Sequence, residues 1–154
     1  MAFTGNFMCT SFKKALLDGE MDFSANTNDT FKIALYTNSA SLTAATNGYA
    51  NSTGGEVANG NGYDTAGKTL SISQVPTSTG TGTTVFLSFG TINWTSSTIT
   101  ARGALIYRSS GANTNTAVAV LDFLADKSSS NGTFEVQFPT NNATSAIIRI
   151  ETPS

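Results

Sequence analysis

The chain has 154 residues, a formal net charge of −2 and a single cysteine, so it is long enough for one domain with its own core. Its eight lysines and arginines are scattered, and no basic cluster is present that would attract nucleic acid. It contains no histidine, which removes catalytic triads and imidazole metal sites. We therefore expect no nucleic-acid partner, no metal and no cofactor.

The N-terminal residues lack the basic region and apolar run that together mark a secretory signal. No stretch of the sequence is apolar enough to span a bilayer, so we expect no membrane partner. These patterns indicate a protein made in the cytoplasm. Cys9 lies next to Met8, and we expect it to be a buried thiol that packs as a small apolar residue.

One short helix is predicted near the N-terminus, from Ser11 to Asp18. Ser11 or Thr10 would be its N-cap, and Gly19 would end it. This helix and the polar stretch after it form an N-terminal arm over residues 1–30. The arm precedes the main β domain.

That domain, residues 31–154, begins with alternating apolar and polar residues at 31–37, the period expected of a strand with one buried face. A long loop follows at about 38–67. It is rich in Gly and Asn and has no sustained apolar period. Loops of this length in compact domains are usually functional surfaces, and Tyr49 and Tyr63 are its candidate contact residues.

Short alternating or apolar runs predict the remaining strands. They lie at residues 68–75, 84–89, 92–99, 98–107, 117–124, 134–138 and 146–151. Pro76 is expected to end the first of them, as at a sheet edge. The run at 117–124, AVAVLDFL, predicts a central strand covered on both faces. Short strands joined by polar turns favour an all-β fold, a β-sandwich or jelly-roll-like domain with one short N-terminal helix.

Residues 62–69, GYDTAGKT, match the expression for a phosphate-binding loop. That loop works only between a buried strand and a helix, because helix N-terminal amides hold the phosphates. Here VANGN precedes the match, and the alternating stretch that follows soon reaches Pro76. We interpret the match as a loop that leads into an ordinary strand at Lys68.

Asp122 lies inside the apolar run at 117–124, where Asp126 or Glu135 would be its partner in a carboxylate pair for sugar hydrolysis. A carboxylate in an apolar strand needs a compensating charge. The available arginines are Arg102, Arg108 and Arg149. A structural ion pair is the preferred interpretation, and we predict that the protein is not an enzyme.

Six tracts spread over most of the chain carry a family resemblance. They are FKKALLDG, DTFKIALYTNSASL, GNGYDTAGKTL, STITARGALIYRSS, AVAVLDFLADKSSSNGTF and AIIRI. Together they resemble a family of small tailed-bacteriophage virion proteins. The resemblance implies a particle component without catalytic residues, most like a capsid cement or decoration protein.

Such a protein would bind the major capsid protein over capsomer junctions on the capsid exterior, as a homotrimer, and stabilise the head shell. The alternative is an adhesive module at a tail tip, baseplate or head fibre that binds host glycan or surface. Buried aromatic side chains usually carry interface energy. The candidate interface residues are Phe3, Phe7, Met8, Tyr49 and Tyr63. The other interpretation is that the arm closes the domain's own core.

Overall fold

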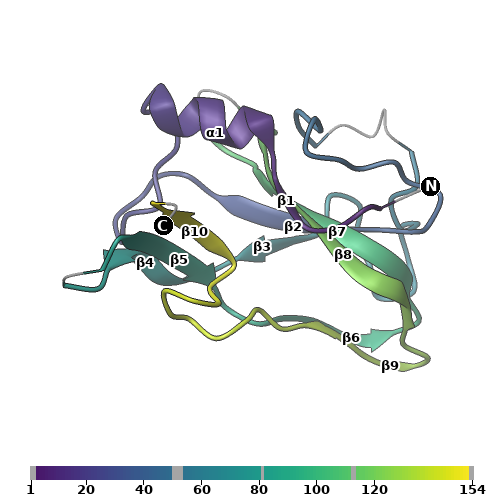
Figure 1. Cartoon of the computed structure of the whole chain (residues 1–154). Coiled ribbons are helices and arrows are strands. Elements are labelled where there is room, and N and C mark those ends of the chain that lie inside the picture. The colour runs from purple at the N-terminus through teal and green to yellow at the C-terminus, as the bar shows by residue number, and fades with distance from the viewer. Residues whose placement is uncertain (1–2, 50–53, 81, 112–113, 153–154) are drawn as a thin grey trace.

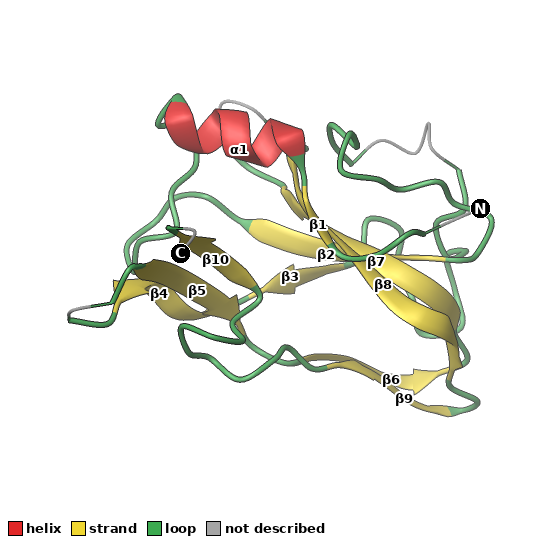
Figure 2. Cartoon of the chain, viewed as in Figure 1, coloured by secondary structure: helices red, strands yellow, loops and turns green. Residues whose placement is uncertain are grey.

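Strands are the main secondary structure of the computed structural model, which describes residues 3–49, 54–80, 82–111 and 114–152 (Figure 1). The elements in chain order are β1 (Phe7–Met8), α1 (Thr10–Leu17), β2 (Phe31–Tyr36), β3 (Lys68–Leu70), β4 (Ile72–Ser78), β5 (Thr84–Phe89), β6 (Ile92–Ser97), β7 (Thr100–Arg108), β8 (Ala117–Ser128), β9 (Gly132–Val136) and β10 (Ile148–Glu151). The predicted all-β fold with one short N-terminal helix is confirmed (Figure 2). Within the described residues, no helix has the length and apolar character needed to cross a bilayer.

The strands lie in two layers, and every paired neighbour is antiparallel. The first layer is a five-stranded sheet in the order β1-β8-β7-β2-β3. The second layer contains the sheet β10-β5-β4 and the pair β6-β9, which lie below the first layer in Figure 1. Only Gly90 and Thr91 separate β5 from β6, and later strands pair with each, β10 with β5 and β9 with β6. The second layer is thus divided into two sheets.

A single apolar cluster fills the space between the layers. Phe31 of β2 and Phe89 of β5 join them, with ring centroids 5.9 Å apart. Phe23 stacks on Phe31 at 4.4 Å, so the segment between α1 and β2 also belongs to this core. In the second layer, Trp94 of β6 is fully buried and packs edge-on against Phe134 of β9. Such aromatic pairs add to the stabilisation that burial alone provides.

The helix starts one residue before the predicted position, and Cys9 is its N-cap in place of Ser11 or Thr10. The reason is that β1 runs directly into the helix. The Cys9 amide still donates to Val118 O of β8, at 2.9 Å, which fixes Cys9 in extended conformation. The hydroxyl of Ser11 instead donates to Ala117 O, at 3.0 Å. Gly19, at a φ of 70°, follows the helix as predicted.

Two predicted strands differ most from the structure. Residues 68–75, predicted as one strand, form β3 and β4 in different sheets. β4 continues through Pro76 to Ser78, because it is the edge strand of its sheet and its register shifts between Gln74 and Thr77. A residue without an amide proton is tolerated at such a place. β8 is confirmed as an inner strand, but it runs on to Ser128 and is covered only in its first half. Leu124, the end of the apolar run, is 79% exposed.

The segment predicted as an N-terminal arm is part of the sandwich. Phe7 and Met8 pair with Val120 and Ala119 at the edge of the five-stranded sheet. Phe3 is buried over β7, where a Cβ at Gly103 would lie 2.4 Å from the Phe3 ring. Only glycine at this position leaves room for the ring.

Candidate functional site

All four tyrosines of the chain lie around one carboxylate, that of Glu56 in the long loop. The hydroxyls of Tyr49 and Tyr63 donate to its two oxygens, each at 2.8 Å. The amide of Ala66 donates to the same carboxylate at 2.7 Å. Tyr36 meets Glu56 through a backbone bridge. We call these residues, with Tyr107, the Glu56 cluster.

Tyr107 completes the cluster by joining it to β7. Its ring stacks on Tyr49 with centroids 4.6 Å apart, and its hydroxyl donates to Ala66 O at 2.7 Å. Burial, with the Glu56 carboxylate nearby, raises the pKa of Tyr49 to about 12. Burial also raises the pKa values of Tyr63 and Tyr107. The cluster therefore holds neutral tyrosines that fasten the long loop to the five-stranded sheet.

This arrangement gives Tyr63 and Tyr49 structural contacts inside the chain. Tyr63 is 1% exposed, and its hydroxyl also accepts the amide of Leu35 at 3.0 Å. Tyr49 is half-buried. The predicted loop includes residues 50–53, which lie outside the described residues.

The three candidate residues of the N-terminal segment differ in their surroundings. Phe3 is 5% exposed and belongs to the core, as the alternative interpretation expects. Phe7 is half-buried and packs against the same core. Met8 is also half-buried, but it lines an open groove. Of the five candidate residues, Met8 is the one that lines this groove.

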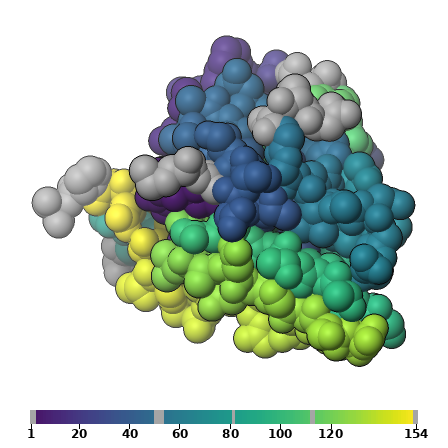
Figure 3. Space-filling model, turned by 90° about the vertical axis from the view of Figure 1, so that its right-hand side faces the viewer, coloured from purple at the N-terminus to yellow at the C-terminus, as the bar shows by residue number. Residues whose placement is uncertain are grey.

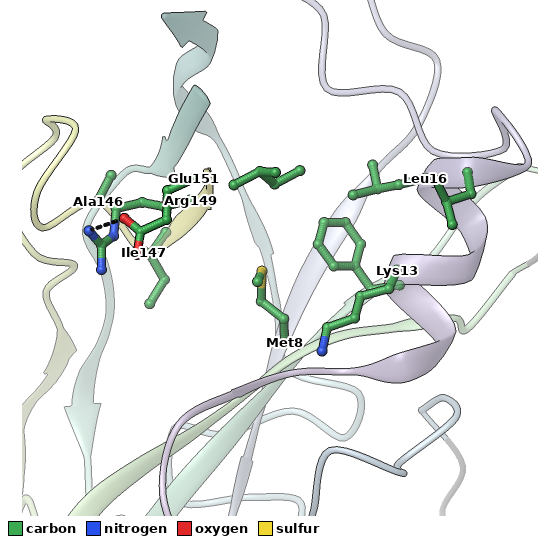
Figure 4. Close-up of a pocket in the computed structure, with 10 residues that line it drawn as sticks. Met8, Lys13, Leu16, Ala146, Ile147, Arg149 and Glu151 are labelled. Atoms are coloured by element: carbon green, nitrogen blue, oxygen red, sulfur yellow. Dashed lines mark hydrogen bonds and ion pairs between the residues drawn. The ribbon is translucent and has the colours of Figure 1, made fainter. Parts of the chain in front are cut away.

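This groove, here called the α1–β10 groove, has a volume of about 640 Å³ and a mainly apolar lining. α1 forms one wall with Phe12 and Leu16, and the C-terminal segment forms the other with Ile147 and Ile150. Met8 lies between these walls in Figure 4. A smaller cavity of about 100 Å³ shares several of these residues and adds Val85.

The groove lies between two strands that are each paired on one side within the described residues. β1 pairs with β8 alone, and β10 pairs with β5 alone. Leu17 and Ile150 add apolar surface at the groove and are 90% and 55% exposed. Unpaired strand edges beside exposed apolar side chains are typical of surfaces that another chain covers.

Charges at the groove are unevenly balanced. Arg149 forms an ion pair with Glu151 at 3.3 Å, shown by the dashed line in Figure 4. Lys13, which also lines the groove, forms no ion pair with any described residue. The groove therefore presents one free positive charge beside its apolar walls.

Sequence reasoning missed Leu17 and Ile150, the exposed apolar residues of the groove. The signal for Leu17 is the Leu16-Leu17 doublet, because two successive leucines cannot both face the core from one helix. Phe12 and Ala15 are the buried residues of α1, and Leu17 points away from them. For Ile150 the sequence carries no such signal, since alternation in β10 does not tell which face stays uncovered.

The other sequence candidates have structural roles. Asp122 accepts a hydrogen bond from Arg102 Nε at 3.1 Å, which confirms the predicted ion pair. Lys68 begins β3 as predicted, so a strand follows residues 62–67 where a phosphate-binding loop needs a helix. Cys9 is fully buried, and burial raises its pKa to about 11. Among the described residues, no group of three or more acidic, cysteine or histidine side chains could hold a metal ion.

No protein-family model, no curated protein and no solved structure matches this chain.

Proposed function

We propose that this protein is a structural subunit of a tailed-phage virion, a capsid decoration protein that binds outside the head shell and stabilises it. It has no catalytic role in this proposal. Its partners are the major capsid protein and further copies of itself. The resemblance of the six sequence tracts supports the class, and the α1–β10 groove supports a function carried out by contacts.

The groove is the observation that carries the proposal. A decoration protein acts through contacts with the assembled shell and with further copies of itself, so a contact surface such as this groove must be preformed on a rigid body. Here α1 and β10 are held by the core, because Phe12 and Ile148 are buried in it. Leu17 and Ile150, which line the groove, remain exposed. Covering this apolar surface would provide the free energy of binding.

The test uses heads of the encoding phage with and without the protein. We expect many copies per head by quantitative mass spectrometry, and we expect heads without the protein to burst at a lower temperature. Adding wild-type protein should restore the bursting temperature. Leu17→Lys should fail to restore it, because it places a charge in the groove at a 90% exposed position.

Ser41→Lys is the matched control, since Ser41 is exposed and lies outside the groove lining. It should restore the bursting temperature as wild type does. An unchanged bursting temperature in heads without the protein would contradict the proposal. So would a few copies confined to the tail.

A second groove favours the adhesive alternative. It has a volume of about 540 Å³ between the exposed half of β8 and β9. Phe123 supplies an aromatic side chain, and Lys127, Glu135 and Gln137 supply polar groups. A few polar groups around an apolar surface are typical of small-ligand sites. Binding of host glycans that Phe123→Ala abolishes would support this function, and unchanged binding would count against it.

A further inference from the structure

β8 carries a mostly exposed segment at residues 123–126, called here the β8 tip. The β7–β8 register moves from Gly103↔Asp122 to Ala101↔Lys127, so two steps along β7 are matched by five along β8. The extra residues leave the ladder and form a bulge. Bulges of this kind redirect side chains and are frequent at functional sites.

Internal hydrogen bonds hold the tip in shape. The Asp122 carboxylate accepts the amide of Leu124 at 2.8 Å and Arg102 Nε at 3.1 Å. Asn38 of the long loop donates to the Asp126 carboxylate at 3.1 Å. Figure 3 shows this side of the molecule, with the green surface of the β7–β8 region below the blue surface of the loop. The tip is therefore a preformed protrusion.

Leu124 is the residue that the tip displays. It is 79% exposed, and its φ of 66° lies in the left-handed region that a bulky side chain rarely adopts. Glycine would occupy this position without strain. An exposed leucine in strained backbone has neither a packing nor a conformational advantage within the chain. Such strain is typical of sites where the side chain has another function.

The α1–β10 groove has the complementary features. It is apolar, and its volume lies within the range of about 300–1,000 Å³ usual for ligand-binding clefts. Its free cation, Lys13, matches Asp126, which forms no ion pair with any described residue. The β8 tip and the α1–β10 groove thus each combine apolar surface with one charge unpaired among the described residues, and the two charges are of opposite sign.

The tip and the groove of one chain cannot meet. Met8 of the groove pairs with Ala119, whereas Leu124 lies five residues further along β8, about 16 Å away at the usual rise per residue. The pairing of β1 with β8 holds both positions in one sheet. A contact between tip and groove would therefore form between copies, head to tail, as in ring-shaped oligomers.

We propose that the β8 tip of one copy binds in the α1–β10 groove of a second copy, with Leu124 against the apolar walls and Asp126 near Lys13. This inference rests on the proposed function in treating the groove as a contact surface, and it names the partner. It gives the self-association expected of a decoration protein a defined interface.

The first test measures association of the full chain by sedimentation equilibrium. Wild type should self-associate, and Leu124→Gly should weaken association at least about tenfold, because burying a leucine side chain contributes that much or more. Leu124→Gly also relieves the backbone strain, so its melting temperature should not fall. Leu17→Lys in the groove should weaken association similarly.

The second test exchanges the charges. Lys13→Glu and Asp126→Lys should each weaken association several-fold, and the double variant should recover most of the loss because the pair is restored with opposite sign. If the fold-loss of affinity in the double variant equalled the product of the two single fold-losses, the proposed pairing of Lys13 with Asp126 would be overturned.

Wild-type protein that stays monomeric up to about 0.5 mM would overturn the inference. If such a monomer still raised the bursting temperature of heads, the groove's partner would be the shell, and the proposed function would stand. If the tip and groove variants weakened association but the protein were absent from heads, the contact would stand and the proposed function would fail.

Discussion

The Glu56 cluster allows a graded prediction, because the two tyrosine hydroxyls that donate to Glu56 have different surroundings. Tyr63→Phe keeps the ring but removes the hydroxyl that donates to Glu56 and accepts the buried amide of Leu35. A hydrogen bond to a charged group contributes about 1.5–3 kcal/mol, and an unsatisfied buried amide costs about 1–3 kcal/mol. We expect a loss of about 3 kcal/mol in the free energy of unfolding.

Tyr49→Phe removes one hydrogen bond to the same carboxylate, but Tyr49 is half-buried, so water can replace the hydroxyl. We expect a cost of about 1 kcal/mol. For a chain of this size, these values correspond to a lowering of the melting temperature by about 6–12 °C for Tyr63→Phe and about 2–4 °C for Tyr49→Phe.

Urea denaturation of the two variants, alone and combined with Glu56→Gln, provides the assay. In the Glu56→Gln background, Tyr63→Phe should cost clearly less than in wild type, because the partner of the hydroxyl has already changed. The reasoning would be refuted if the two tyrosine variants lost equal stability. It would also be refuted if the effects of Tyr63→Phe and Glu56→Gln were additive.

Three further predictions concern sterics, alkaline pH and the thiol. Gly67→Ala should cost at least about 3 kcal/mol by urea denaturation, because its Cβ would lie 1.8 Å from Ile33 O. Gly19→Ala has a similar positive φ but open space, so it should cost about 1 kcal/mol; equal costs would contradict the steric argument. The folded pKa of Tyr49, about 12, exceeds its ordinary value of 10.0, so the stabilisation is fully present below pH 10.0 and is lost towards about pH 12. Urea midpoints that stay constant between pH 10.0 and about pH 12 would count against this loss of stabilisation at Tyr49. Cys9, fully buried with a pKa of about 11, should react with Ellman's reagent only as fast as the chain opens, and immediate labelling at neutral pH would show otherwise.

The strands with long alternating patterns could be predicted from the sequence. β5 has the predicted bounds, and β2 differs by one residue, because in each a buried face repeats every second position. β1 could not be predicted in this way. Two residues are too few to show a period, and β1 exists because β8 offers Ala119 and Val120 as partners.

The contact surfaces were less accessible to sequence reasoning. Tyr49 and Tyr63 are aromatic residues in a polar loop, and nothing local indicates that Glu56 accepts both hydroxyls. The groove needs α1 and β10, which lie at opposite ends of the chain. Leu124 closes an apolar run that predicts burial, and only the register shift in β8 turns it outward.

The place of β10 decides how the protein can be tagged. β10 is the last strand, and Glu151 at its end lines the α1–β10 groove. A fusion partner attached directly after β10 would therefore lie beside the groove and compete with whatever binds there. Phe3 lies against Gly103 of β7, and the purple segment that leads into β1 comes from the side away from β10 in Figure 1. Affinity tags and displayed cargo are better attached at the N-terminal side, where the groove stays open.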